Sequence, residues 1–361
     1  MDSKVSIITV CYNSESTIEQ TILSVLSQTY HNIEYIIVDG ASHDHTLDII
    51  RKYSTRIQLI SETDDGIYHA MNKGIMKSTG DIVGIINSDD WYESNAVELA
   101  VEYLRAEKFD LAYGGCTCIY DNGLTREFKC SRLEDILFRM VFAHQTVFVK
   151  KKIYEKYGIF NQMYKIAADY DLLLRFYKCG VRMIEIPANI AFYRMSGISN
   201  TNYLNTIKET KEVALAHWDG NSLEIREKIE KYSEERFVYA ELQKDMNKVK
   251  HEMVEIALKF FSQENKYIIF GAGDFGIKSL MILLQNNYII EYFVDNDSRK
   301  WGENCGDIEV KPPDYLREYH KNVIIANVYH KEEIQKQLED MGYRYGIDCF
   351  FMEDILIKIM T

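Results

Sequence analysis

The chain has 361 residues, 47% of them hydrophobic, which is enough for two globular domains and a connector. A formal net charge of -13 argues against a general nucleic-acid-binding protein, because phosphate binding needs an excess of Lys and Arg. No apolar stretch approaches the roughly 20 residues that span a bilayer. The start MDSKVSIITV lacks the features of a secretory signal, and the seven cysteines form no CxxC pair. We therefore expect a protein of the reducing cytoplasm.

The first hundred residues alternate short β-branched runs with amphipathic helical patterns, which is typical of a parallel βαβ sheet. The expected strands cover residues 5–10, 35–38, 57–60 and 82–86. Ser16 and Glu19 have the spacing of a capping box that opens the first helix. Acidic and amide residues follow the strands, namely Asp39, Asp64, Asp65, Asn87, Asp89 and Asp90. Because ligands of open α/β sheets bind beyond the carboxyl ends of the strands, this acidic edge predicts a bound metal.

The pair Asp89 and Asp90 directly follows the strand at 82–86. One carboxylate of such a pair can hold a divalent cation while the other accepts a hydrogen bond from a sugar hydroxyl. Oxygen ligands suit Mn²⁺ or Mg²⁺, and the diphosphate of a nucleotide would complete the coordination shell and gain stabilisation as it leaves. The alternative is that the pair caps a helix that begins near Asn95.

Six segments in order resemble the family 2 glycosyltransferases, which have the fold called GT-A. They are ITVCYNSESTIEQTILSVLSQTY, IIVDGASHDHT, SETDDGIYHAMNKGI, GDIVGIINSDDW, HQTVFVKK and AADYDLLLR. The resemblance covers residues 3 to 200 and is strongest to the bacterial branch that builds surface polysaccharides. It implies an inverting, metal-dependent transfer of a sugar from a nucleotide-sugar, with uridine as the expected base. The acceptor would be a hydroxyl of a glycan or a lipid-linked glycan.

The resemblance also assigns roles to individual residues. Four residues are expected around the nucleotide base, namely Thr9, Tyr12, Asn13 and Asp39. Further donor contacts are expected from Asp65, Asn72 and Lys73. Asp90 would bind the metal, and Asp89 would bind a donor hydroxyl or share the metal. Asp169 matches the general base that takes the proton from the acceptor hydroxyl.

A single carboxylate base is what inversion in one displacement requires. Asp169 opens an apolar helical pattern, so its alternative role is to cap that helix, and Asp171 is the second candidate for the base. His144 could contact the diphosphate, the acceptor or the metal, or only backbone groups of its loop. Arg194 could balance phosphate charge or be an ordinary surface arginine.

Residues 205–262 have the pattern of a long charged helix between two domains, which we expect at residues 1–204 and 263–361. A heptad pattern of apolar residues runs along it, namely Tyr239, Leu242, Met246, Val249, Met253, Ile256 and Phe260. It predicts either a homodimer through residues 225–260 or docking against the chain's own domains. The apolar segment 135–142 is expected in the core, with peripheral contact to the inner face of the membrane as the alternative.

The C-terminal region begins with a predicted strand at 266–270 that runs into three glycines, Gly271, Gly273 and Gly276. Asp295 follows the next strand, which is typical of a dinucleotide-binding turn, and the segment resembles Rossmann-like units appended to bacterial sugar-modifying enzymes. We expect an accessory or ligand-sensing domain. The alternatives are an NAD-dependent activity on sugar nucleotides and, for the whole chain, a non-catalytic scaffold of polysaccharide assembly.

Overall fold

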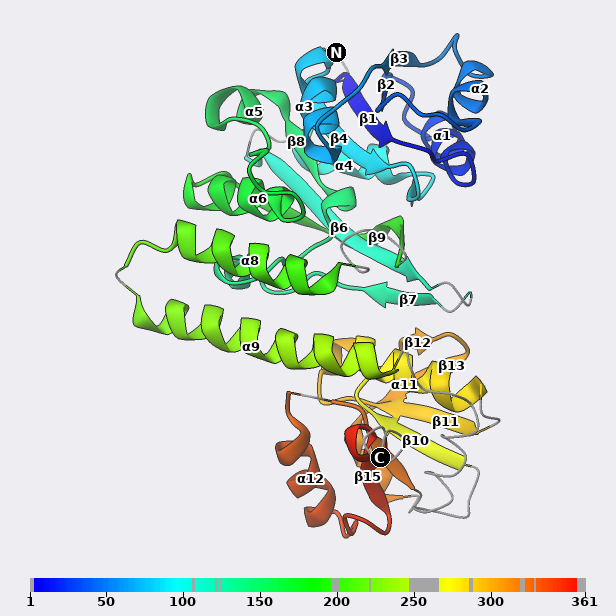
Figure 1. Ribbon diagram of the computed structural model, residues 1–361, viewed down its shortest axis with the longest axis vertical. Helices are drawn as coiled ribbons and strands as arrows, with labels where there is room; N and C mark the ends of the chain where they lie inside the picture. The colour runs from blue at the N-terminus through cyan, green and yellow to red at the C-terminus, as the bar shows by residue number, and fades with distance from the viewer. Residues whose placement is uncertain are drawn as a thin grey trace. The chain divides into compact units, whose positions relative to one another are not determined.

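The computed structural model describes residues 3–105, 108–120, 123, 125–195, 202–220, 222–246, 266–285, 288–318, 322–327 and 329–355. The chain divides into two compact units, Met1–Tyr232 and Ser233–Thr361. Each unit is an α/β structure with its own sheet (Figure 1).

The first unit is built on one mixed sheet with the strand order β3-β2-β1-β4-β8-β6-β9-β5, and β7 pairs with β6. The strands are β1 (Val5–Cys11), β2 (Ile33–Asp39), β3 (Gln58–Ser61), β4 (Ile82–Asn87), β5 (Trp91–Tyr92), β6 (Leu111–Ile119), β7 (Thr125–Phe128), β8 (Phe148–Lys150) and β9 (Met183–Arg194). Strands β3, β2, β1 and β4 are parallel, whereas β8 is antiparallel to both β4 and β6. The four strands predicted in the first hundred residues are confirmed.

Helices cover this sheet because its central strands are apolar on both faces, and every residue of β1 is buried. The helices are α1 (Ile18–Leu26), α2 (Thr46–Arg51), α3 (Ile67–Lys77), α4 (Ala96–Arg105), α5 (Lys151–Tyr157), α6 (Ala168–Lys178) and α8 (Tyr203–His217). Helix α3 packs closely on β1, since a Cβ atom at Gly74 would lie 2.4 Å from Ile8 Cγ2. Only glycine fits at that contact.

The predicted capping box at the start of α1 is wrong. The cap residue is Thr17, and no side chain makes a capping hydrogen bond. Glu19 instead accepts a hydrogen bond of 2.9 Å from the Tyr53 hydroxyl and lies 3.4 Å from Lys52 Nζ. A contact with a distant part of the chain has therefore replaced the local one that the spacing predicts.

The register of the parallel strands brings the ends of β1, β2, β3 and β4 to one edge. Asp39 at the end of β2 lies beside Cys11 on one side and Ser61 on the other. Asn87 at the end of β4 lies beside Val10. The polar residues that follow these strands in sequence are therefore gathered at this edge, as the βαβ pattern predicts.

The segment 135–142 belongs to the core, as expected. A 3-10 helix, Leu133–Leu137, replaces the longer amphipathic helix, and Ile136, Val141 and Phe142 are fully buried. None of the helices in the described part of the chain is long and apolar enough to cross a membrane. Helix α9 (Leu223–Met246) follows α8. The predicted heptad seam falls on residues 239–260, whose side chains lie outside the description, so it stays a prediction.

The second unit contains a six-stranded sheet with the order β12-β13-β11-β10-β14-β15. Its elements are β10 (Lys266–Phe270), α11 (Asp274–Gln285), β11 (Ile289–Val294), β12 (Asn304–Cys305), β13 (Ile308–Lys311), β14 (Val323–Ile325), α12 (Lys331–Asp340) and β15 (Cys349–Phe351). Asp295, expected to bind a ribose, accepts hydrogen bonds from the Ala272 N–H at 2.8 Å and from Lys300 Nζ at 2.7 Å. Its carboxylate thus holds the glycine turn from within the unit.

A partly exposed network around Glu34 ties β2 to the N-terminal strand and gives a prediction about acid stability. Burial raises the pKa of Glu34, but hydrogen bonds from Lys4, Ser6 and Thr79 outweigh it and lower the pKa to about 2. A lowered folded-state pKa stabilises the fold above the unfolded pKa, and this stability is lost as the pH falls from about 4.5 to about 2.

We expect Glu34→Gln to lower the free energy of unfolding at pH 7 by about 1 kcal/mol, well below the full value of the pKa shift, because solvent screens the partly exposed groups. The difference should close towards pH 2. Denaturant unfolding across this pH range would measure it. Glu102→Gln, at an exposed position of α4, is the control. An equal loss at pH 7 and pH 2 would contradict the prediction, since it would mean that the charge of Glu34 is not the cause.

Candidate active site

Two unusual backbone conformations mark the carboxyl edge of the sheet. Among the residues that the structure describes, Asn13 and Ala41 are the non-glycine residues with positive φ, at 50° and 62°. They follow β1 and β2, where the two strands end side by side. Such conformations cost free energy and gather at functional sites, because the surrounding structure must hold them in place.

Tyr12, Gly40 and Asp64 approach each other closely at this edge. A Cβ atom at Gly40 would lie 2.7 Å from Asp64 Oδ2 and 3.5 Å from Tyr12 Cδ2. The Tyr12 side chain is nevertheless 59% exposed, which leaves an aromatic ring open to stack with a flat ligand. Asn13 is exposed as well, and its Oδ1 accepts a hydrogen bond of 2.9 Å from the His43 N–H.

The other two residues expected around the nucleotide base are enclosed. Asp39 is fully buried, and its oxygens accept hydrogen bonds from the Ser42 hydroxyl at 2.5 Å and the Ser61 hydroxyl at 2.7 Å. A ligand could reach Asp39 only if one of these serines moved. Thr9 is also fully buried, with its hydroxyl 3.0 Å from the Tyr35 hydroxyl, so the structure gives it a place in the core.

The three residues expected to contact the donor from the SETDDGIYHAMNKGI segment lie in different environments. Asp65 is exposed, just before α3, and its backbone N–H donates to His69 Nδ1 at 3.0 Å. Lys73 Nζ lies 2.9 Å from Glu62 Oε1, so its charge is balanced by a partner at the surface. Asn72 is buried, and its side chain makes two hydrogen bonds, of 2.9 and 3.0 Å, with the backbone of Phe160. Asn72 thus has a structural role in holding Phe160, and its expected contact with the donor stays a prediction.

The Asp89 and Asp90 pair lies between β4 and β5, and α4 begins only at Ala96, so the pair does not cap that helix. Asp90 is fully buried, and it accepts hydrogen bonds of 2.9 Å from Gln145 Nε2 and from the Arg194 N–H. Burial, with the nearby charge of Asp89, raises the pKa of Asp90 to about 8. Asp89 is partly exposed, and burial raises the pKa of its carboxyl too. Asp89 is thus the more exposed carboxylate of the pair, and the assignment of the metal to Asp90 and Asp89 stays a prediction.

Arg194 holds the segment that carries this pair. Its Nε donates to the Asp89 carbonyl at 2.8 Å, and its Nη2 donates to Gln20 Oε1 at 2.5 Å. The guanidinium also lies 4.8 Å from the centre of the Trp91 ring. The structure therefore uses Arg194 to fix the Asp89 and Asp90 segment, in place of the free phosphate-binding arginine that was one expectation.

The proposed base, Asp169, lies in the first turn of α6 and is partly exposed. Its Oδ1 accepts hydrogen bonds from the Tyr68 hydroxyl at 3.2 Å and from the Tyr170 N–H at 2.8 Å. Asp171, the second candidate, is buried and lies 2.8 Å from His217 Nε2 and 3.1 Å from Arg175 Nη2. Although burial raises the pKa of Asp171, these hydrogen bonds outweigh it and lower the pKa. Asp171 therefore forms structural ion pairs with Arg175 and His217.

His144 shares a cavity with Asp169. The cavity is lined by Ile85, His144, Val147, Tyr154, Phe160, Asp169, Leu172 and Leu173. His144 Nε2 is buried without a hydrogen-bond partner, and burial lowers the pKa of the imidazole despite the opposing effect of Asp169. A neutral imidazole with an unused ring nitrogen is thus available beside the carboxylate of Asp169.

Three functional contacts were not predicted from the sequence: those of Gln145, Tyr68 and Glu209. Gln145 bonds Asp90 across 55 positions of the chain, and Tyr68 bonds Asp169 across 101. Glu209 accepts from backbone groups just before α6. No local sequence pattern identifies Tyr68 or Glu209. Gln145 directly follows His144, a predicted site residue, and this position could have marked it as a candidate.

The side chains at this edge supply only part of the ligands that a divalent cation needs. No group of three or more His, Cys, Asp and Glu side chains gathers to hold a metal among the residues with described side chains. Two adjacent carboxylates are nonetheless suitable ligands for Mg²⁺ or Mn²⁺ when phosphate oxygens supply the rest of the shell. Burial is the main cause of the raised pKa values of both carboxyls, and the charge of Asp89 adds to it at Asp90. A bound cation would favour the charged form of both groups.

Comparison with protein families gives two matches. Residues 6–169 match the model of glycosyl transferase family 2, and residues 263–346 match the model named C2185-like, N-terminal. Residues 6–169 are thus similar to the family 2 glycosyltransferases, and we refer to them as the glycosyltransferase domain. This domain contains β1 to β4, the Asp89 and Asp90 pair, and Asp169 as its last residue.

Curated relatives agree with the family of the glycosyltransferase domain. A PGL/p-HBAD biosynthesis glycosyltransferase of Mycobacterium tuberculosis is 29% identical over 211 residues, which cover 57% of this chain and 79% of the relative. An uncharacterized glycosyltransferase of Rickettsia prowazekii is 28% identical over 228 residues, which cover 60% of this chain and 70% of the relative. Both are described as glycosyltransferases, and sugar transfer is therefore the activity that the similarities support.

Solved structures show that the glycosyltransferase domain has a GT-A-like fold. S. aureus TarS 1-349 in complex with UDP-GlcNAc matches with a TM-score of 0.53 and 18% identity, over 71% of this chain and 79% of that chain. The mannosyltransferase PcManGT from Pyrobaculum calidifontis, in complex with GDP-Man and Mn²⁺, matches with a TM-score of 0.50 and 20% identity, over 63% of this chain and 68% of that chain. At these identities the likeness concerns the fold alone.

Proposed function

We propose that this chain transfers a sugar from a nucleoside diphosphate donor to an acceptor hydroxyl, with inversion at the anomeric carbon. One observation carries the proposal. His144 and Gln145 are consecutive, yet His144 lines a cavity with Asp169 while Gln145 donates to Asp90. This link through one short segment supports a single site that contains both the candidate base and the candidate cation-binding pair.

The chemistry of this site divides between two sides. On the acceptor side, Asp169 takes the proton of the hydroxyl whose oxygen attacks the anomeric carbon, and the bond from that carbon to the diphosphate breaks as the new bond forms. One displacement of this kind inverts the configuration. Neutral His144 contributes a ring nitrogen that can bond the acceptor or the donor sugar.

On the donor side, the open residues are Tyr12, Asn13, Asp65 and Asp89. Tyr12 would stack on the base, and Asp89, with Asp90 behind it, would hold Mn²⁺ or Mg²⁺. When bound, such an ion stabilises negative charge on the departing diphosphate. Complexes of TarS with UDP and UDP-GlcNAc, and of PcManGT with GDP-Man and Mn²⁺, support a nucleotide-sugar donor and a cation here. We propose a UDP-sugar as the donor and Mn²⁺ as the cation.

The proposal extends to the arrangement of the chain. We propose residues 1–204 as the catalytic domain, 205–262 as a helical connector and 263–361 as a Rossmann-like accessory domain in polysaccharide biosynthesis. An NAD-dependent activity of the second unit has less support, because the Asp295 carboxylate already bonds Ala272 and Lys300. None of the seven cysteines, all of which lie in the described residues, is in a disulfide, which supports a reducing compartment such as the cytoplasm.

A screen of nucleotide-sugar donors tests this function. The full chain is incubated with each UDP-, GDP- and TDP-sugar, with and without Mn²⁺, and the release of the nucleoside diphosphate is measured. We expect release from at least one UDP-sugar that depends on Mn²⁺ and increases with a glycan acceptor. Absence of release with every donor, while the protein is folded, would favour the non-catalytic scaffold.

A further inference from the structure

The loop that leads into α6 is held by one carboxylate from another helix. Glu209, on α8, accepts hydrogen bonds through Oε2 from three consecutive backbone N–H groups, those of Lys165 at 3.0 Å, Ile166 at 2.7 Å and Ala167 at 3.0 Å. Its Oε1 accepts a second bond of 3.2 Å from the Lys165 N–H. Charged acceptors make the stronger hydrogen bonds in proteins, so this loop is firmly fixed at Glu209.

Helix α6 has no cap from its own sequence. Its cap residue is Ala167, which cannot accept a hydrogen bond through its side chain. The first N–H groups of a helix need acceptors, and a negative charge near them is favourable. Glu209 supplies from α8 a negative charge and an acceptor for the N–H of the cap residue Ala167, just before the first turn in which Asp169 lies.

A second contact of α8 lies on the other side of Asp169. His217, near the end of α8, lies 2.8 Å from the Asp171 carboxylate. Helix α8 therefore holds α6 both before and after Asp169. On the opposite side, the Tyr68 hydroxyl of α3 donates to the Ile166 carbonyl and to Asp169 Oδ1. The backbone that aims the Asp169 carboxylate is thus fixed from two helices.

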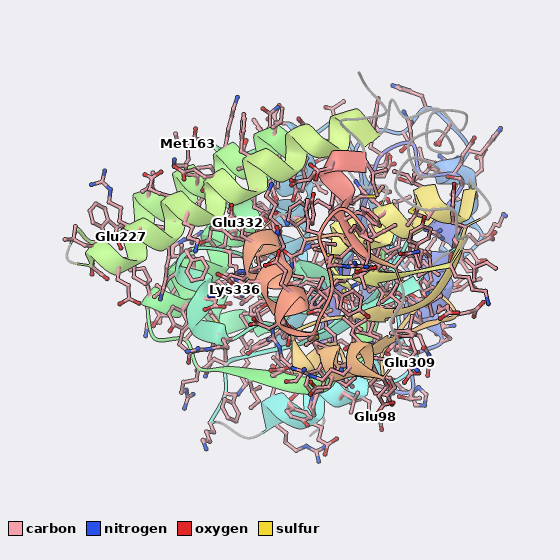
Figure 2. All side chains as sticks on the ribbon, turned by 90° about the horizontal axis from the view of Figure 1, so that it is seen from below. Glu98, Met163, Glu227, Glu309, Glu332 and Lys336 are labelled. Carbon is pink, nitrogen blue, oxygen red and sulfur yellow. The ribbon has the colours of Figure 1, made fainter. Side chains whose placement is uncertain are left out.

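We propose that Glu209 is a positioning residue for the general base, so that α8, which lies beyond the matched domain at 6–169, completes the acceptor side of the site. This inference rests on the proposed function. Glu209 does not itself act on the substrate; it fixes residues 165–167 and thereby the direction of Asp169. Met163, on the same loop, is 85% exposed and projects from the surface (Figure 2), so the loop also presents a side chain to solvent.

The test compares Glu209→Ala and Glu209→Gln with Glu212→Ala, an exposed glutamate on the same helix. We expect Glu209→Ala to lower kcat by about 10- to 100-fold, because a small misplacement of a reacting group has effects of this size. The KM for the donor and the affinity for the nucleoside diphosphate should stay within about twofold. Glu209→Gln should recover part of kcat, because its amide oxygen still accepts hydrogen bonds but carries no charge. Glu212→Ala should match the wild type.

Three outcomes would overturn the inference: a folded Glu209→Ala variant with wild-type kcat, a donor KM that rises as kcat falls, or equal losses in Glu209→Ala and Glu212→Ala. If Glu209→Ala does not fold, the inference is tested by the kcat of Glu209→Gln. A wild-type kcat in that variant would overturn the inference. Failure of the proposed function looks different, since the wild type would then release no nucleoside diphosphate or Asp169→Asn would remain active.

Discussion

Asp169→Asn should lower kcat for sugar transfer by about 10²- to 10⁴-fold while the donor nucleotide still binds. The amide keeps the size of the side chain and can still accept the hydrogen bond from Tyr68, but it cannot take a proton from the acceptor. Rates of nucleoside diphosphate release with acceptor present would measure the loss, and calorimetric titration with UDP would measure the retained binding.

Asp171→Asn is the matched control, because it lies on the same helix two residues away. It breaks the ion pair with His217 and weakens the contact with Arg175. It should therefore lower the unfolding temperature, while its effect on the rate of transfer should be much smaller than that of Asp169→Asn. If Asp171→Asn removes transfer from a folded protein while Asp169→Asn does not, the base has been assigned to the wrong residue.

Asp89→Asn should remove the stimulation by Mn²⁺ and lower kcat by roughly 10²-fold or more, as the loss of groups that stabilise leaving-group charge commonly does. Asp89 is the more exposed carboxylate of the pair, so it is the one that a cation and a diphosphate can reach together. Chelation of the wild type should have the same effect, and added Mn²⁺ should restore the rate in the wild type but not in the variant.

Asp48→Asn, at an exposed position on α2, is the control for the charge change. It should leave both the rate and the Mn²⁺ dependence unchanged. Full turnover of the chelated wild type would contradict the prediction, and it would leave the Asp89 and Asp90 pair with the structural role of bonding Gln145 and the end of β9.

The sheet and its acidic edge could be predicted because their signals are local. Runs such as Val5 to Val10 are buried on both faces, and the parallel order of the strands brings their ends together whatever the distant contacts are. The core position of Ile136, Val141 and Phe142 followed from the same kind of pattern. The start of α1 was predicted wrongly because Glu19 finds Tyr53, a partner that lies 34 residues away.

The sequence did not predict which polar residues of the matched segments are buried and which are exposed. Thr9 and Asn72 lie in segments that match the family, but their polar groups bond Tyr35 and Phe160 inside the core. Asp90 follows its strand as expected, yet contacts with Gln145 and β9, both distant in sequence, enclose it. Whether a polar residue faces a ligand depends on such long-range contacts, which a motif does not contain.

His144 and Gln145 are neighbours in the chain but contact different groups, and this limits how the segment can change. Consecutive Cα atoms are about 3.8 Å apart, so a displacement of this segment would move His144 and Gln145 together. A change that shifts the segment should therefore disturb the contact with Asp90 and the lining of the Asp169 cavity at the same time.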